Sequence, residues 1–299
     1  MSVDVRVAYP CDAALGEGAF WDQATQTLWW LDVPMPSRLF SVHPASGAAN
    51  SVSMPEMITS MRPFKDGSGL IVASHGGINR FDPRTGSLSR LFDPEPHKPF
   101  NRCNDGGTDG RGRFWFGTMQ NNIAPNGDGI AIASAAGSLF CLDPDLTLHE
   151  MESGIGIANT VCWSPDQQTF YFSDTMTGVI AAYDFDGETG SISRKRPFAR
   201  FERGVPDGST VDAEGFLWNA RWGGHCVVRF APDGRVDRLI EVPVSLPTSV
   251  AFGGPDLATL YITTARYGFS AEDRAREPWA GHLLACEPGV TGLPVTPFG

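Results

Sequence analysis

The sequence predicts an all-β fold, a six-bladed β-propeller. The chain of 299 residues contains 34 Gly and 23 Pro, and no stretch has a sustained apolar period of 3.6 residues, so short strands joined by turns are expected. A pattern of strand, Asp/Gly turn and aromatic strand recurs six times along the chain, at a period of about 45 residues. A single four-stranded unit of that length cannot bury both faces without neighbours, which favours closure of the units into a ring.

The six repeats are recognised by their opening segments. They begin at GAFWDQATQTLWWLDV, SMRPFKDGSGLIVASH, GGTDGRGRFWFGTM, TVCWSPDQQTFYFSD, STVDAEGFLWNARW and SVAFGGPDLATLYITTA. Residues 3–9 form a lone predicted strand before the first repeat, and the last repeat ends one strand short after residues 282–287. We therefore expect one domain over residues 1–299 in which the N-terminal strand closes the last blade and leaves no open sheet edge. A two-sheet sandwich explains neither the repeat nor the split blade.

Two segments interrupt the repeats. Residues 120–137 (QNNIAPNGDGIAIASAAG) lengthen a connection in the third repeat, and Gly- and Asn-rich insertions on a rigid scaffold often contact substrate, so a lid is expected there. Near the C-terminus, Ser270 followed by Asp273 resembles a capping box and predicts one short peripheral helix.

Composition and charge exclude several classes of function. The net charge is -11 and the isoelectric point is about 4.9, so no basic surface for nucleic acid or for a membrane is expected. The start MSVDVRVAYP has no signal-peptide pattern, and no run of about 18 apolar residues occurs. We expect a cytoplasmic protein, a monomer or weak homo-oligomer. Its six cysteines are scattered singly, as expected for small buried residues in a reducing compartment.

One polar position recurs in every repeat. When the repeats are aligned on their first turn, this position is occupied by Glu17, Ser60, Asn104, Asn159, Asp207 and Thr248. The innermost strand of each blade lines the central channel of a propeller, so these side chains are expected to form a ring around the axis. All six carry oxygen, and the set contains neither Cys nor His. Such donors suit Ca²⁺, Mg²⁺ or Mn²⁺, and Zn²⁺ stays open.

The two acidic members of this ring favour a central metal site. Glu17 and Asp207 would repel one another in a narrow channel, and each would raise the pKa of the other unless a cation neutralised them. The alternative is that water separates the two carboxylates, which would then only hydrate the channel. A divalent ion removes the repulsion, so we predict one metal ion at the mouth of the channel.

Four longer segments extend the pattern around the ring. They are LGEGAFWD at Glu17, NRCNDGGTDGRGRFWFGTM at Arg102 and Asn104, SPDQQTFYFSDT after Asn159, and PDGSTVDAEGFLWNARWGG at Asp207. In order and spacing they resemble the senescence marker protein 30/gluconolactonase/luciferin-regenerating-enzyme family, also called regucalcin-like, over nearly the whole chain. The resemblance implies a six-bladed propeller that binds one divalent metal through Glu17, Asn159 and Asp207.

The resemblance also implies a substrate. Family members that hydrolyse sugar lactones, in particular bacterial aldonolactonases, look most similar, so glucono-, xylono-, arabinono- or galactonolactone is the expected substrate. Arg102 and Asn104 match substrate-binding positions, and Asn104 matches a residue close to the metal. Animal members carry a substrate-binding glutamate after the GTM segment. Asn122 is the matching residue here, which leaves the particular lactone open.

Hydrolysis of a lactone needs a polarised carbonyl and an activated water, and a metal with few protein ligands serves both needs. Asp207 is the candidate to orient or deprotonate the water, and Glu17 is the second candidate for that role. Arg102 and Asn104 flank Cys103, so the alternation of an extended strand places both on one side, facing a sugar. A surface ion pair is the alternative for Arg102.

Other chemistries are less consistent with the sequence. It contains no G-x-S-x-G elbow, no P-loop and no dinucleotide fingerprint, so a serine hydrolase and a nucleotide cofactor are not expected. Two alternatives stay open. One is a phosphotriester or organophosphate hydrolase on the same propeller, and the other is a calcium-binding propeller without catalysis.

Overall fold

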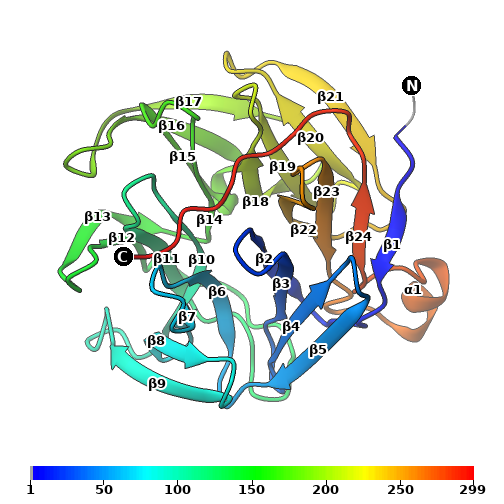
Figure 1. The fold of residues 1–299 in the computed structure, drawn as a ribbon, viewed down its shortest axis with the longest axis horizontal. Coiled ribbons are helices and arrows are strands. Elements are labelled where there is room, and N and C mark those ends of the chain that lie inside the picture. The colour runs from blue at the N-terminus through cyan, green and yellow to red at the C-terminus, as the bar shows by residue number, and fades with distance from the viewer. Residues whose placement is uncertain (1–2) are drawn as a thin grey trace.

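A computed structural model describes residues 3–299 as six four-stranded sheets arranged around a central axis (Figure 1). All strand pairs are antiparallel, and in five sheets the strands follow one another in chain order. The predicted six-bladed propeller is therefore confirmed. We call each sheet a blade and number the blades in chain order.

The blades contain the following strands. Blade 1 has β2 (Gly16–Asp22), β3 (Thr27–Asp32), β4 (Arg38–His43) and β5 (Ala48–Ser53). Blade 2 has β6 (Ile58–Pro63), β7 (Leu70–Ser74), β8 (Gly77–Asp82) and β9 (Ser87–Phe92), and blade 3 has β10 (Asn101–Thr108), β11 (Phe114–Gln120), β12 (Gly137–Leu142) and β13 (Leu148–Ile155). Blade 4 has β14 (Ala158–Trp163), β15 (Thr169–Asp174), β16 (Val179–Asp186) and β17 (Ser191–Arg200), and blade 5 has β18 (Val205–Val211), β19 (Leu217–Trp222), β20 (Cys226–Phe230) and β21 (Val236–Glu241). Blade 6 has β22 (Pro247–Gly253), β23 (Thr259–Thr264), β24 (Leu283–Cys286) and β1 (Arg6–Tyr9).

The recurring Asp/Gly turn has a physical role that blade 5 shows well. Asp212, at the end of the innermost strand, accepts backbone hydrogen bonds from Glu214 and Phe216, both at 3.0 Å. Its other oxygen accepts from the indole of Trp218 at 2.8 Å and from Arg229 at 2.7 Å. One buried carboxylate thus closes the turn and anchors the aromatic strand that follows, as Asx turns do. Asp109 has the corresponding contacts in blade 3.

The last blade joins the two ends of the chain. In β1, Arg6 lies opposite Ala285 and Val7 opposite Leu284 of β24. The sheet order β1-β24-β23-β22 pairs the edge of β24 with the N-terminal strand. An exposed edge at that place would be a template for pairing with another chain.

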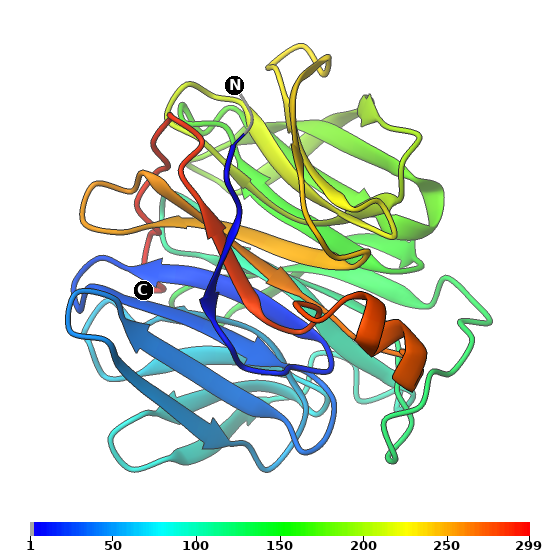
Figure 2. The same ribbon diagram turned by 90° about the vertical axis from the view of Figure 1, so that its right-hand side faces the viewer.

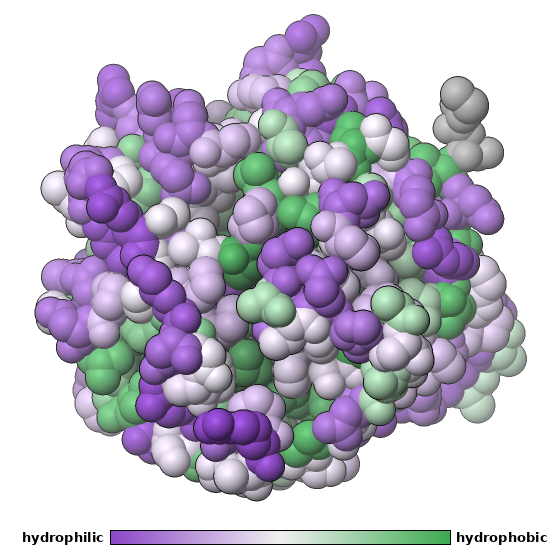
Figure 3. Space-filling view, viewed as in Figure 1, coloured by the Kyte–Doolittle hydropathy of each residue, from purple (hydrophilic) through white to green (hydrophobic). Residues whose placement is uncertain are grey.

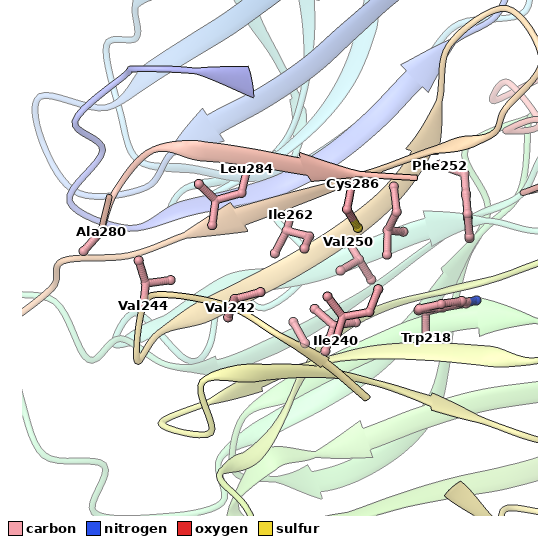
Figure 4. Close-up of a cluster of buried hydrophobic side chains, with 13 residues drawn as sticks. Trp218, Ile240, Val242, Val244, Val250, Phe252, Ile262, Ala280, Leu284 and Cys286 are labelled. Carbon is pink, nitrogen blue, oxygen red and sulfur yellow. The ribbon is translucent and has the colours of Figure 1, made fainter. Parts of the chain in front are cut away.

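The hydrophobic core lies between neighbouring blades. Between blades 5 and 6, side chains from the facing sheets interlock, among them Trp218, Ile240, Val250, Phe252 and Leu284 (Figure 4). The Trp218 and Phe252 rings meet edge to face with centroids 5.9 Å apart. Because each interface is closely packed, the position of every innermost strand around the axis is set by both neighbours.

The C-terminal segment, residues 287–299, crosses one face of the ring (Figure 1). Its Thr291 carbonyl accepts from Ala213, and Phe298 pairs with the backbone of Pro63 and Lys65. These partners follow or end the innermost strands of blades 5 and 2, so the segment covers the face where those strands end. Apolar residues on this face form small separate patches among polar ones (Figure 3).

Helix α1 (Ala271–Arg276) and the insertion 120–137 lie on the opposite side of the ring from the C-terminal segment (Figure 2). The predicted capping box is confirmed, since Ser270 accepts from the Asp273 N–H and the Asp273 side chain accepts from the Ser270 N–H. All six cysteines are buried and free. No helix within the described residues 3–299 is long and apolar enough to cross a membrane.

The pairing of β1 with β24 leads to a first prediction. Deletion of residues 1–9 removes the strand and the half-buried Val3, Val5 and Val7, which pack against the core between blades 5 and 6. We expect a loss of roughly 2–4 kcal/mol from the buried area and concentration-dependent aggregation through the exposed β24 edge. Denaturant unfolding and light scattering measure the two effects.

The matched control is Arg6→Ala, which removes only the exposed ion pair between Arg6 and Glu287. This change should cost less than about 1 kcal/mol. If the truncated protein were as stable and as monodisperse as Arg6→Ala, the role given to β1 would be wrong.

Candidate functional site

A cavity of about 360 Å³ lies on the axis, at the end of the ring where the innermost strands begin. All six residues selected from the sequence line it: Glu17, Arg102, Asn104, Asn122, Asn159 and Asp207. They come from blades 1, 3, 4 and 5 and from the insertion after β11. The other lining residues are Leu15, Met119, Ile157, Thr175, Met176, Val205, Trp222 and Tyr267.

Every innermost strand is irregular at its ring residue. The register shifts between Glu17 and Phe20, Ile58 and Ser60, Cys103 and Gly106, Asn159 and Cys162, Pro206 and Ser209, and Pro247 and Ser249. A β-bulge bends a strand and redirects a side chain out of the regular pleat. The same distortion occurs in all six blades, and in blades 1, 3, 4 and 5 the ring residue lines the axial cavity.

Backbone strain accompanies the bulge next to Asn159. Thr160 has a φ of 58°, which is a rare conformation for a β-branched residue. The Thr160 hydroxyl donates to the backbone carbonyl of Asp207 at 2.7 Å, so the strained residue of one blade is held by the strand of the next. Such strain persists where the surroundings enforce it, which is common at functional sites.

The surroundings of the two ring carboxyl groups disfavour their charged forms. Burial, and then the charges of Asp207 and Asp105, raises the pKa of Glu17 well above its usual range. Burial and Asp105 likewise raise the pKa of Asp207. Arg102 favours the charged form of Glu17, and Arg221 that of Asp207, but each effect is smaller than that of burial. The site therefore lacks sufficient positive charge of its own.

This donor set fits a hard divalent cation. Within residues 3–299, no three His, Cys, Asp or Glu side chains are grouped as metal ligands, so the amide oxygen of Asn159 is needed beside Glu17 and Asp207. Two carboxylates and an amide carbonyl are typical ligands of Ca²⁺ and related ions. A bound cation would also offset the burial and the neighbouring negative charges that raise both pKa values.

A chain of hydrogen bonds runs from Asn159 to the insertion. Asn104 donates to Asn159 Oδ1 at 3.1 Å and accepts from Arg102 at 2.6 Å. Arg102 also donates to Asn122 Oδ1 at 2.7 Å. The Arg102 side chain is buried, which lowers its pKa to about 10, so the alternative of a surface ion pair is wrong. Cys103 turns away into the core, as the alternation predicted.

Thr175 was not found from the sequence. It begins the 3₁₀ helix η1 (Thr175–Thr177), and its hydroxyl accepts from Asn159 Nδ2 at 2.8 Å. The same hydroxyl donates to the carbonyl of Pro206, the neighbour of Asp207, at 2.8 Å. Thr175 thereby orients the Asn159 amide so that its oxygen faces away from η1, and it ties blade 4 to blade 5. It lies outside the aligned ring position, so the repeat gave no signal for it.

Two ring residues do not line the cavity. The Thr248 hydroxyl bonds to that of Thr263 at 2.8 Å, and Ser60 is buried. Tyr267 was also missed: its hydroxyl lies 3.5 Å from the Asn122 carbonyl, at the border between the cavity and the insertion.

Known proteins resemble the chain over most of its length. The SMP-30/Gluconolactonase/LRE-like region matches residues 15–266. The 6-deoxy-6-sulfogluconolactonase of Pseudomonas putida is 35% identical over 282 residues, 94% of this chain and 93% of that protein. The L-arabinolactonase of Azospirillum brasilense is 34% identical over 287 residues, 95% of this chain and 92% of that protein. Among solved structures, the calcium-binding protein regucalcin of Agrobacterium tumefaciens has a TM-score of 0.92 at 31% identity, covering 100% of this chain and 98% of that one.

The raised carboxylate pKa values predict how the metal-free protein responds to pH. A carboxyl group whose pKa rises on folding binds its proton more tightly in the folded state, so it costs stability as the pH rises from its unfolded pKa through its folded pKa. Asp207→Asn removes this cost and relieves Glu17. Without metal, we expect the free energy of unfolding of this variant to increase relative to that of wild type as the pH rises from 5 to 8. The expected increase is about 1 kcal/mol or more, since one pKa unit corresponds to about 1.4 kcal/mol.

Denaturant unfolding in a chelator, repeated across this pH range, measures the difference. The control is Glu202→Gln, which removes an exposed carboxylate. Its stability should change with pH in the same way as that of wild type. A constant offset between Asp207→Asn and wild type at all pH values would contradict the prediction.

Proposed function

The chain belongs to the SMP-30/gluconolactonase/LRE-like family, and we propose that its central cavity hydrolyses sugar lactones to aldonic acids with one divalent metal ion. The observation that carries the proposal is the pair of carboxylates, the buried Asp207 and the partly buried Glu17, that line one cavity together with three amide side chains. Relatives that bear lactonase names match 94% and 95% of this chain, and the regucalcin structure with the same fold is described as calcium-binding.

We assign Glu17, Asn159 and Asp207 as the residues that hold the metal. When bound, a divalent ion supplies a Lewis acid for the lactone carbonyl and balances the two negative charges. Gly18 donates its N–H to Glu17 Oε2 at 3.2 Å, and no side chain among residues 3–299 donates to either carboxylate. Both therefore keep an oxygen that can accept a proton from a water. We assign this role to Asp207, with Glu17 as the second candidate.

Arg102, Asn104 and Asn122 are assigned to the sugar. The Arg102 guanidinium bonds to both amides and so fixes their orientation before substrate enters, which lowers the entropy cost of binding. Its Nε has no hydrogen-bond partner in the protein, and a buried donor of this kind is costly unless a ligand pairs with it.

The remaining assignments are coarser. A small sugar lactone is the proposed partner, and the net charge of -11 argues against nucleic acid. We propose a cytoplasmic location and a monomer or weak homo-oligomer. The relatives' names point to different lactones, a sulfonated hexonolactone and a pentonolactone, at almost equal identity.

Removal and return of metal test the proposed function. Protein stripped with a chelator should lose turnover of aldonolactones and regain it with Ca²⁺, Mg²⁺, Mn²⁺ or Zn²⁺ supplied separately. Glu17→Gln, Asn159→Ala and Asp207→Asn should each reduce activity on the order of a hundredfold or more, because each removes a ligand or changes the charge around the ion. Base uptake measures turnover, and titration calorimetry measures metal affinity.

A panel of phosphotriesters assayed in parallel distinguishes a lactonase from the alternative of a phosphotriester hydrolase. Metal-dependent lactone turnover would exclude the other alternative, a calcium-binding propeller without catalysis. Normal turnover by a folded Asp207→Asn variant would reject the assignment of the site.

The contacts of Thr175 lead to a separate prediction. Thr175→Val keeps the shape of the side chain but leaves Asn159 Nδ2 without its acceptor. Loss of such an outer contact typically weakens metal binding by about 10–100-fold, and we expect a loss in this range by calorimetry. Thr175→Ser retains the hydroxyl and should retain the affinity. Equal metal affinity of the Val and Ser variants would show that Thr175 does not position Asn159.

A further inference from the structure

One wall of the cavity is apolar. It consists of Ile157 and Met176, next to the innermost and second strands of blade 4, and of Val205 and Trp222 in blade 5. Met176, on η1, is 62% exposed and marks the mouth of the cavity. Trp222 ends β19 and pairs with Val205 at the start of β18. Met119 and Leu15 also line the cavity, but Met119 lies opposite Arg102 and Leu15 packs against the same cluster as Tyr267, so both lie on the polar side. The apolar wall therefore comes from strand ends and connections of the neighbouring blades 4 and 5.

The cavity also has very little positive charge. Its lining includes no Lys and no His, and one Arg. Both terminal nitrogens of Arg102 are engaged: Nη1 donates to Asn104 Oδ1 and to the carbonyl of Cys103 at 2.9 Å, and Nη2 donates to Asn122. Three of the five Arg102 N–H groups therefore donate within the protein, and the Nε N–H is buried without a partner, so the one cation of the lining is committed to the polar wall.

The three surfaces of the cavity divide a lactone into three parts. The carbonyl belongs at the end that holds Glu17 and Asp207, which the proposed function assigns to the metal. Ring hydroxyls pair with the wall of Arg102 and Asn122, where the Tyr267 hydroxyl also lies. The apolar wall is left for the distal substituent, the group farthest from the carbonyl.

We propose that the cavity selects neutral sugar lactones with a small apolar distal substituent, such as a methyl group, and disfavours those with a sulfonate or phosphate there. The proposal rests on the proposed function and extends it to the substrate class. An anion placed against this wall would lose water without gaining a cationic partner, which is costly. A methyl group has no hydration by polar contacts to lose, and it removes apolar surface of Trp222 and Met176 from water.

A series of three substrates tests the inference directly. The 1,5-lactones of 6-deoxygluconate, gluconate and 6-deoxy-6-sulfogluconate differ only at C6, which carries hydrogen, hydroxyl or sulfonate. After subtraction of spontaneous hydrolysis, we expect kcat/KM to be highest for the deoxy lactone and at least about tenfold lower for the sulfonated one. A difference of this size is expected when a charged group is bound without a polar partner. A sulfonated lactone turned over as well as the deoxy lactone would overturn the inference and leave the proposed function standing. No turnover of any of the three would reject both.

A charge placed on the apolar wall should reverse the preference. Met176→Lys supplies a cation at the mouth, and the 62% exposure of Met176 makes disruption of the fold unexpected. We expect the ratio of kcat/KM for the sulfonated over the deoxy lactone to rise by about tenfold, and less in high salt, which screens exposed charges.

The control is Leu146→Lys, which adds the same charge to an exposed residue in the turn between β12 and β13, at the far end of blade 3. It should leave the ratio unchanged. An equal rise in Leu146→Lys, or no rise in Met176→Lys, would contradict the role of the apolar wall.

Discussion

The convergence of two carboxylates in the axial cavity, the buried Asp207 and the partly buried Glu17, is the constraint around which this molecule is organised. They belong to strands of different blades, β2 and β18, so they cannot move apart unless the packing between blades gives way. A bulge in each strand keeps the side chains directed at the axis. The closed ring therefore holds two carboxyl groups where their charged forms are disfavoured, a cost in stability that a bound cation would offset.

Around these carboxylates the protein provides hydrogen bonds between blades. Thr175 bonds to Asn159 in its own blade and to the backbone beside Asp207 in the next. Thr160 makes a second link between the same two blades through the Asp207 carbonyl. Asn104 joins blade 3 to Asn159. A site whose members are fixed to one another across blade boundaries is preorganised, because no single strand can shift without breaking contacts to its neighbour.

The two walls of the cavity have different structural origins. The two carboxylates and the amides of Asn104 and Asn159 lie on the innermost strands, whose positions are set by the core between blades. Within the apolar wall, Ile157 and Met176 lie on connections at the open face, whereas Val205 and Trp222 are strand ends. Connections tolerate substitution better than packed strands do, so Ile157 and Met176 can change without disturbing the ring residues.

The sequence by itself determined the propeller and the ring. The repeat of Asp/Gly turns and aromatic strands is local and periodic, because every blade packs against its two neighbours in the same way. Alignment of the repeats identified Glu17, Asn104, Asn159 and Asp207 at one position. Only the tertiary structure decided which ring residues share the cavity, since Ser60 and Thr248 occupy the same repeat position without lining it. It also revealed Thr175, Met176, Trp222 and Tyr267. These residues meet through connections of different length and through contacts between blades, and neither leaves a periodic signal in the chain.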